Sequence, residues 1–158
     1  MAKGLWILFV AVLAAACAEP VDVTQALQVT DVSTAWSDAG IVNGENKLVP
    51  SITFRLKNVS DQPLRVLQVN ATFRRVNDPQ DWGSQFLKVS GADGLEPGAT
   101  TDALTATSNL GYTSTDPRAE MLNSEYFVDA KVELAAKHGA ELLAKIAEFP
   151  IERRLIAK

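Results

Sequence analysis

The chain contains one thiol and one imidazole, the side chains that most often serve as nucleophile and base in covalent catalysis. The thiol belongs to Cys17 and the imidazole to His138. His138 lies in a Lys-His-Gly segment that is typical of an exposed turn, and no Gly-x-Ser-x-Gly motif supplies a serine nucleophile. The sequence therefore predicts no catalytic triad, and we expect no catalytic residues.

Carboxylates offer a second kind of chemistry. Asp78 and Asp81 flank Trp82, an arrangement that a small glycoside hydrolase could use, although acids in a proline-containing loop are commonly just solvated. Several loop acids could supply oxygen ligands to Ca²⁺, but their spacing is not that of an EF-hand. We therefore expect no metal and no cofactor. The loop acids in question are Asp38, Glu45, Asp78, Asp81, Asp93 and Glu96.

Three aromatic residues fall outside the clear core pattern of the chain: Trp36, Trp82 and Tyr112. If they are exposed together, they form a candidate binding surface for a carbohydrate or a protein partner, because aromatic side chains anchor interfaces. Taken singly, each could instead pack over the edge of a core. Exposure of the side chains separates the two interpretations.

The first residues are typical of an export signal. A short basic start at Met1–Lys3 precedes an uninterrupted apolar run over Leu5–Ala16, which is followed by Cys17. The run of 12 residues is shorter than the roughly 20 that a membrane-spanning helix needs. One interpretation is cleavage after Ala16-Cys17-Ala18, just before Glu19, which would release a secreted protein.

The segment Leu13-Ala14-Ala15-Ala16-Cys17 also resembles the lipobox of bacterial lipoproteins. The lipobox usually has Leu three residues before the cysteine, where this chain has Ala14. The resemblance implies a signal peptide over residues 1–16 and a lipid on Cys17, which would anchor the exported protein to a membrane. In a Gram-negative cell, Ala18 in place of Asp implies the outer membrane, facing the periplasm.

Length and charge limit the remaining possibilities. The chain has 158 residues with a formal net charge of −4 and no basic cluster, so we expect no nucleic-acid partner. The length suits one domain after the leader. We expect a lipidated tether over residues 17–26 and one domain over residues 27–158.

Alternating apolar and polar residues predict strands through most of this domain. Ile52, Phe54 and Leu56 alternate with polar neighbours, and a second such stretch runs over residues 64–76. The short polar connection between them predicts that these two strands pair as an antiparallel hairpin. Residues 38–47 are expected to form a polar loop.

The last third of the chain allows two interpretations. Residues 128–136 alternate as a strand, but residues 140–149 are rich in helix-forming Ala, Glu, Leu and Lys. We favour a hairpin that turns at residues 137–140, with Pro150 on an edge strand. The sequence then has about seven strands and predicts an all-β fold, a single antiparallel immunoglobulin-like β-sandwich; the alternative is an α+β fold with a helix near residues 140–149.

Two turn motifs carry a further resemblance. The stretch Phe54–Leu64 contains Asn58-Val59-Ser60 and Pro63, and Leu95-Glu96-Pro97-Gly98 follows later. This pattern resembles the small immunoglobulin-like domains of bacterial envelope lipoproteins, the FxLYD-like group, over residues 50–105. The Phe-x-Leu-Tyr-Asp string itself is absent. The resemblance implies a fold and an envelope location and no reaction.

The function expected from the sequence is that of a non-enzymatic, lipid-anchored protein of the cell envelope. Its sandwich would serve as an interaction or assembly module for an envelope protein partner. The alternatives are a module that binds carbohydrate or cell wall through exposed aromatic residues, and a small hydrolase.

Overall fold

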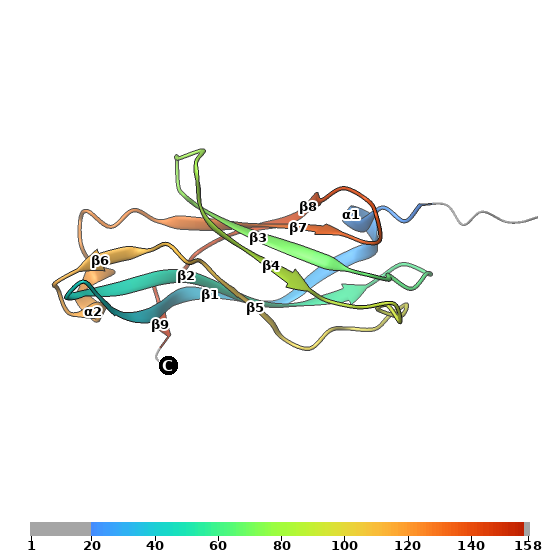
Figure 1. Ribbon diagram of the computed structural model, residues 1–158, viewed down its shortest axis with the longest axis horizontal. Helices are drawn as coiled ribbons and strands as arrows, with labels where there is room; N and C mark the ends of the chain where they lie inside the picture. The colour runs from blue at the N-terminus through green and yellow to red at the C-terminus, as the bar shows by residue number, and fades with distance from the viewer. Residues whose placement is uncertain (1–19, 157–158) are drawn as a thin grey trace, which may run out of the picture.

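The computed structural model describes residues 20–156, which form two facing β-sheets (Figure 1). One sheet has the order β5-β2-β1-β9, with β6 also paired to β2, and the other has the order β4-β3-β7-β8. All pairs are antiparallel except β1 with β9. The first sheet contains β1 (Leu27–Val42), β2 (Glu45–Asn58), β5 (Leu104–Thr107), β6 (Tyr112–Ser114) and β9 (Leu155–Ile156), and the second contains β3 (Gln68–Arg75), β4 (Asp81–Lys88), β7 (Ala130–Lys137) and β8 (Ala144–Pro150).

The all-β sandwich expected from the sequence is confirmed. Alternate residues of the central strands turn into the space between the sheets, as the period of a strand requires. Most of the predicted inward residues are fully buried, and they form a single core with residues of the connecting loops. These fully buried residues are Ile52, Phe54 and Leu56 of β2, Val69, Ala71 and Phe73 of β3, and Ala130, Val132, Leu134 and Ala136 of β7. Val128, at the start of the predicted strand 128–136, is instead 42% exposed and lies before β7.

The hairpin predicted in the last third of the chain is also confirmed, and the alternative of a helix over 140–149 is wrong. β8 pairs antiparallel with β7 from Ala136↔Ala144 to Lys131↔Pro150. β8 is the outer strand of its sheet, so the missing N–H of Pro150 breaks no central ladder. The pairing with β7 therefore outweighs the helix propensity of this segment.

The predicted pairing of the strand at residues 52–57 with the strand at 64–76 is wrong. These segments became β2 and β3, which lie in opposite sheets. The connection over residues 59–67 crosses the sandwich, where Leu64 and Leu67 are fully buried. Nine strands are present within residues 20–156, rather than about seven, because short β6 and β9 add to the first sheet.

The first two strands are longer than the sequence suggested. β1 and β2 continue through the predicted polar loop at residues 38–47 and pair as far as Val42↔Glu45. The hairpin closes on Asn43 and Gly44, which have φ of 52° and 84°. Two successive positive φ angles are those of a type I′ turn, for which Asn-Gly is the preferred pair.

The helical turn α1 (Val23–Ala26) corrects the expected tether over residues 17–26. Val23 and Ala26 are buried in the core, and Asp22 caps the turn by accepting a hydrogen bond from Thr24 N at 2.9 Å. Burial of apolar side chains therefore makes residues 23–26 part of the folded domain. Residues 1–16 and Cys17 lie outside the described residues.

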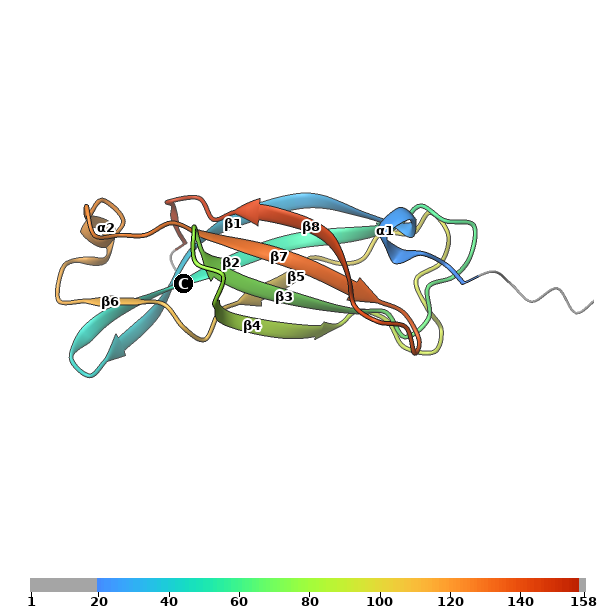
Figure 2. The same ribbon diagram turned by 90° about the horizontal axis from the view of Figure 1, so that it is seen from above.

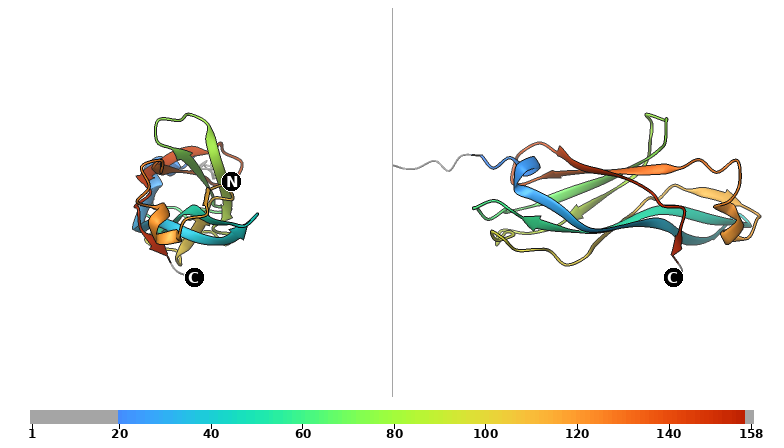
Figure 3. Two further views of the ribbon diagram at one scale, coloured as in Figure 1. Left: turned by 90° about the vertical axis from the view of Figure 1, so that its left-hand side faces the viewer. Right: turned by 180° about the vertical axis from the view of Figure 1, so that it is seen from behind.

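The sandwich is elongated, and its two ends differ (Figures 2 and 3). We call one the α1 end, where α1, the connection 59–67 and the β7–β8 turn gather. We call the other the pocket end, which contains β6 and the helical turn α2 (Arg118–Met121). No helix among residues 20–156 is long and apolar enough to cross a membrane.

Candidate functional site

Four aromatic rings meet near the pocket end and connect the two sheets. β1 and β6 both pair with β2, which brings Trp36 and Tyr112 to 5.8 Å between ring centroids. Trp82 of β4 lies 6.0 Å from Trp36 and 5.0 Å from Tyr112. Phe127, in the loop after α2, lies 4.7 Å from both Trp36 and Tyr112. Sequence reasoning missed Phe127, because only the folded loop 122–129 brings it to this cluster.

The structure thus brings together the three residues of the candidate binding surface, but not as an exposed surface. Trp36 is fully buried, so the expectation of an exposed indole is wrong for this residue. Trp82 and Tyr112 are half-buried at the margin of the core. The cause is the closing of this end of the sandwich by Phe127, whose ring packs edge-on against Trp36.

A pocket of about 200 Å³ opens beside this cluster. Tyr112, Met121, Tyr126 and Phe127 supply its apolar walls, and Tyr126 is 82% exposed. Polar groups complete the lining: Thr113, Ser114, Asp116 and Ser124. Aromatic walls with a few polar groups are the usual composition of a small binding pocket.

The hydroxyl of Tyr112 fixes one wall of the pocket. It donates to the carbonyl of Val128 at 3.1 Å and accepts from the N–H of Val128 at 3.0 Å. Burial raises the pKa of this phenol, so Tyr112 stays neutral at physiological pH. Its role is to bind the loop 122–129 to β6.

Arg153 holds the same loop from the other side. Its Nε donates to Asp129 Oδ1 at 2.7 Å, and its two terminal nitrogens donate to the carbonyls of Leu122 and Phe127. The guanidinium also lies 5.1 Å from the ring centroid of Phe127. The hydrogen bond from Arg153 to Asp129 raises the pKa of the arginine, so the guanidinium stays charged at every ordinary pH.

The acids beside Trp82 are each paired with an arginine. Asp81 lies 2.8 Å from Arg74, and Asp78 lies 2.8 Å from Arg75. The N–H of Gln80 is the main cause of the lowered pKa of Asp78. A carboxyl group that is ionised at neutral pH cannot protonate a leaving group, so Asp78 lacks the raised pKa of a glycosidase acid.

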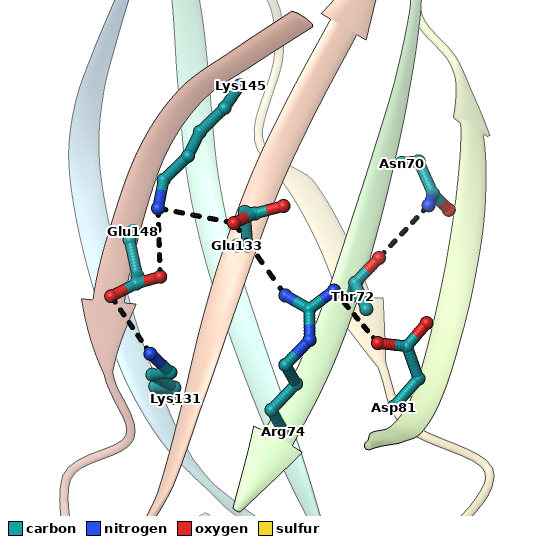
Figure 4. Close-up of polar contacts among 8 residues, drawn as sticks. All are labelled: Asn70, Thr72, Arg74, Asp81, Lys131, Glu133, Lys145 and Glu148. Carbon is teal, nitrogen blue, oxygen red and sulfur yellow. Dashed lines mark hydrogen bonds and ion pairs between the residues drawn. The ribbon is translucent and has the colours of Figure 1, made fainter. Parts of the chain in front are cut away.

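Charged side chains alternate in sign across the outer face of β4-β3-β7-β8 (Figure 4). Arg74 lies between Asp81 and Glu133, and Lys145 lies 3.2 Å from Glu133. Glu148 accepts from Lys145 at 3.0 Å and from Lys131 at 3.4 Å. These contacts balance three cations against three anions, so the network itself carries no excess positive charge that could attract a polyanion.

The pKa values within this network follow from its contacts. The hydrogen bond from Lys145 is the main cause of the lowered pKa of Glu148, and the same bond is the main cause of the raised pKa of Lys145. Both groups are at the surface, where such pairs contribute little to stability. The network ties neighbouring strands together and forms no acid–base pair.

The imidazole of His138 is engaged in contacts within the β7–β8 turn and with the N-terminal segment. His138 Nε2 donates to the carbonyl of Val21 at 3.0 Å and lies 3.5 Å from Glu141. Within the described part of the chain, no three His, Cys, Asp or Glu side chains gather closely enough to hold a metal ion. Cys17, the candidate lipid attachment residue, lies outside the described residues.

Comparisons with known proteins complete the description. No protein-family model matches the sequence, and no curated protein matches it. Among solved structures, the chain is similar to one named "Putative ApaA Protein from Bordetella pertussis", with 18% identity over 80% of this chain and 93% of that chain and a TM-score of 0.46. It is also similar to the Northeast Structural Genomics Consortium target SoR45, with 17% identity over 82% of this chain and 89% of that chain and a TM-score of 0.41. At these values the similarities do not identify a function.

Proposed function

We propose that this chain is a non-enzymatic lipoprotein of the bacterial cell envelope that binds a protein partner. In this proposal, residues 1–16 direct export and Cys17 carries the lipid, as the lipobox resemblance implies. In a Gram-negative cell the lipid would lie in the outer membrane and the sandwich in the periplasm. The aromatic pocket between β6 and α2 is the binding site for the partner.

The observation that carries this proposal is the position of the pocket relative to the N-terminus. The described chain begins beside α1, at one end of the elongated sandwich, and β6 and α2 lie at the other (Figures 1 and 3). A lipid on Cys17 would hold the α1 end at the membrane. The pocket would then face away from the bilayer, where a partner can reach it.

The contacts of the ionisable groups support binding rather than catalysis. Asp78 and Asp81 are paired with arginines, and His138 binds a backbone carbonyl near the α1 end, far from the pocket. The pocket itself combines the exposed Tyr126 with the buried Phe127, whose carbonyl accepts a hydrogen bond from Arg153. Tyrosine is among the residues most frequent at the centres of protein interfaces.

The proposal is tested by photo-crosslinking in intact cells. A photoreactive amino acid replaces Tyr126 in the pocket, and a matched variant carries it at Phe86, which is 52% exposed on β4 outside the pocket. We expect a specific adduct with one envelope protein from position 126 and none from position 86. If neither position gives an adduct above that of an unrelated lipoprotein of similar abundance, the proposal is wrong.

A carbohydrate or cell-wall ligand is the second candidate, and the composition of the pocket favours it. Thr113, Ser114 and Ser124 line the same pocket as Tyr126, and hydroxyl-bearing and aromatic side chains together suit a sugar. The buried indole of Trp36 could not stack on such a ligand, so binding would depend on the tyrosines. Retention on purified peptidoglycan that is lost in Tyr126→Ala would favour this candidate over the protein partner.

A further inference from the structure

The α1 end of the sandwich exposes apolar side chains on two neighbouring loops. Leu142 and Leu143, in the β7–β8 turn, are 89% and 43% exposed. Val59 and Val66, in the connection between β2 and β3, are 50% and 39% exposed. Leu142 is the most exposed large hydrophobic residue in the described part of the chain. Large apolar residues grouped in this way commonly mark a contact surface.

These loops lie beside the point where the chain enters the fold. Gly139 N donates to the carbonyl of Arg65 at 3.2 Å, which joins the β7–β8 turn to the connection 59–67. Val59 N donates to the carbonyl of Ala26 at 2.8 Å, and His138 donates to the carbonyl of Val21. The exposed apolar residues and the N-terminal segment therefore share one end of the molecule (Figure 2).

The segment between this end and Cys17 is short, because α1 belongs to the core. Only residues 18–22 separate Cys17 from Val23, and a fully extended chain of that length reaches about 20 Å. The 16 residues of β1 alone span about 50 Å along the sandwich. A lipid on Cys17 therefore could not let the domain turn its α1 end far from the bilayer.

We infer that the α1 end docks on the lipid surface itself, with Leu142 and Leu143 entering the interface between headgroups and acyl chains. This inference rests on the proposed lipid at Cys17. Apolar side chains that are already held at a bilayer gain from leaving water. In the docked domain the pocket would face away from the bilayer, toward the partner. The contact of the α1 end with the lipid would therefore fix the orientation of the domain as well as its distance from the membrane.

The charge of the α1 end indicates what kind of lipid contact this is. Arg65 and Lys137 are accompanied by Asp61 and Glu141, so neither sign dominates around the leucines. Attraction to anionic headgroups needs a cluster of basic residues. The contact should accordingly be apolar, with little dependence on salt or on the fraction of anionic lipid.

The single cysteine makes a direct experiment possible. The full-length variant Leu142→Cys is produced with its lipid, and a lipid on Cys17 leaves residue 142 as the only free thiol. This thiol is labelled with an environment-sensitive fluorophore, and the protein is reconstituted into vesicles of phosphatidylethanolamine and phosphatidylglycerol with brominated acyl chains. The matched control is Ile41→Cys, because Ile41 is 69% exposed but lies in β1 near the hairpin tip at the pocket end.

We expect the label at residue 142 to show blue-shifted emission and quenching by the brominated lipids, and the label at residue 41 to show neither. The shift should persist in high salt and in vesicles without phosphatidylglycerol. Labelled protein that floats with the vesicles but shows water-like emission at residue 142 would overturn the inference and leave the anchor intact. Protein that does not float with the vesicles, whether it carries one labelled thiol or two, would overturn the anchor and the inference together.

Discussion

The side-chain amide of Asn58 donates a hydrogen bond to the carbonyl of Leu95 at 2.8 Å, across 37 residues of sequence. The same amide donates to the carbonyl of Gln62 at 2.8 Å, and its oxygen accepts from the N–H and the hydroxyl of Ser60. Asn58 is fully buried. One side chain thus closes the turn at residues 58–62 and attaches it to the turn at 95–98.

This relationship predicts a large loss of stability in Asn58→Ala. The substitution removes two hydrogen bonds donated by the Asn58 amide nitrogen and two accepted by its oxygen, and each hydrogen bond contributes about 0.5–1.5 kcal/mol. We expect the free energy of unfolding to fall by about 2–4 kcal/mol, measured by urea denaturation of the mature chain. Asn70→Ala is the matched control, because Asn70 is half-buried and donates only to Thr72 Oγ1. Equal losses in the two variants would contradict the role of Asn58.

A second prediction concerns Gly111, which lies just before β6. A Cβ atom at this position would overlap the carbonyl oxygen of Leu48 and lie 2.8 Å from a methyl carbon of Val49. Gly111→Ala should therefore push β6 from β2 and destabilise the protein by about 1–3 kcal/mol. In Gly91→Ala, where nothing lies within 4 Å of the added atom, we expect a change within about 0.5 kcal/mol. Thermal unfolding of the two variants tests the difference. An unchanged unfolding temperature in Gly111→Ala would show that the chain at residue 111 does not approach β2 so closely.

A third prediction separates the core aromatic residues from the exposed one. Trp36→Ala removes a fully buried indole and should cost about 3–5 kcal/mol of folding free energy. Tyr126→Ala, at a side chain that is 82% exposed, should change stability by no more than about 0.5 kcal/mol. Denaturant midpoints of the two variants provide the comparison. A destabilised Tyr126→Ala protein would contradict the assignment of Tyr126 to the pocket surface. That variant could then no longer be used in the ligand-binding tests.

The fourth prediction is a pH dependence that arises from Glu148 and Lys145. The pKa of Glu148 is lowered from its ordinary value near 4.5, so the stabilising contact is complete above that pH and is lost as the pH falls through the folded-state pKa. The pKa of Lys145 is raised above 10.5, so the contact is lost again only as the pH rises beyond that value. In Lys145→Met, NMR should show the Glu148 carboxyl titrating at a higher pH than in the parent protein. An unchanged titration midpoint would mean that Lys131 alone lowers the pKa.

The sequence predicts much of the core because alternation is a local property. Ile52, Phe54 and Leu56 are buried as expected, since a strand places every second residue on one face. Which strand lies beside which is not local, and the β2–β3 pairing failed for that reason. The connection over 59–67 is as suitable for crossing between sheets as for a hairpin, and only the buried contacts of Asn58, Leu64 and Leu67 decide between them.

The candidate site shows the same limit. Trp36, Trp82 and Tyr112 could be recognised as a group, but their exposure could not, because it depends on the loop 122–129 and on Phe127. The hydrogen bonds from Arg153 to that loop join residues that are 31 and 26 positions apart in the sequence. The turn at Asn43-Gly44, in contrast, has a local sequence signal, because Asn-Gly is the preferred pair of a type I′ turn. β1 and β2 continue up to this turn, through the loop expected at residues 38–47.

The central claim, a lipid on Cys17, is tested most directly by the intact mass of the protein extracted from its native membranes, with Cys17→Ala as the control. The account predicts a chain that begins at Cys17 and carries the added mass of a diacylglycerol and an amide-linked acyl chain, and the control should lack both. An unmodified chain that begins at Glu19 would contradict the account and would identify a secreted protein in place of an anchored one.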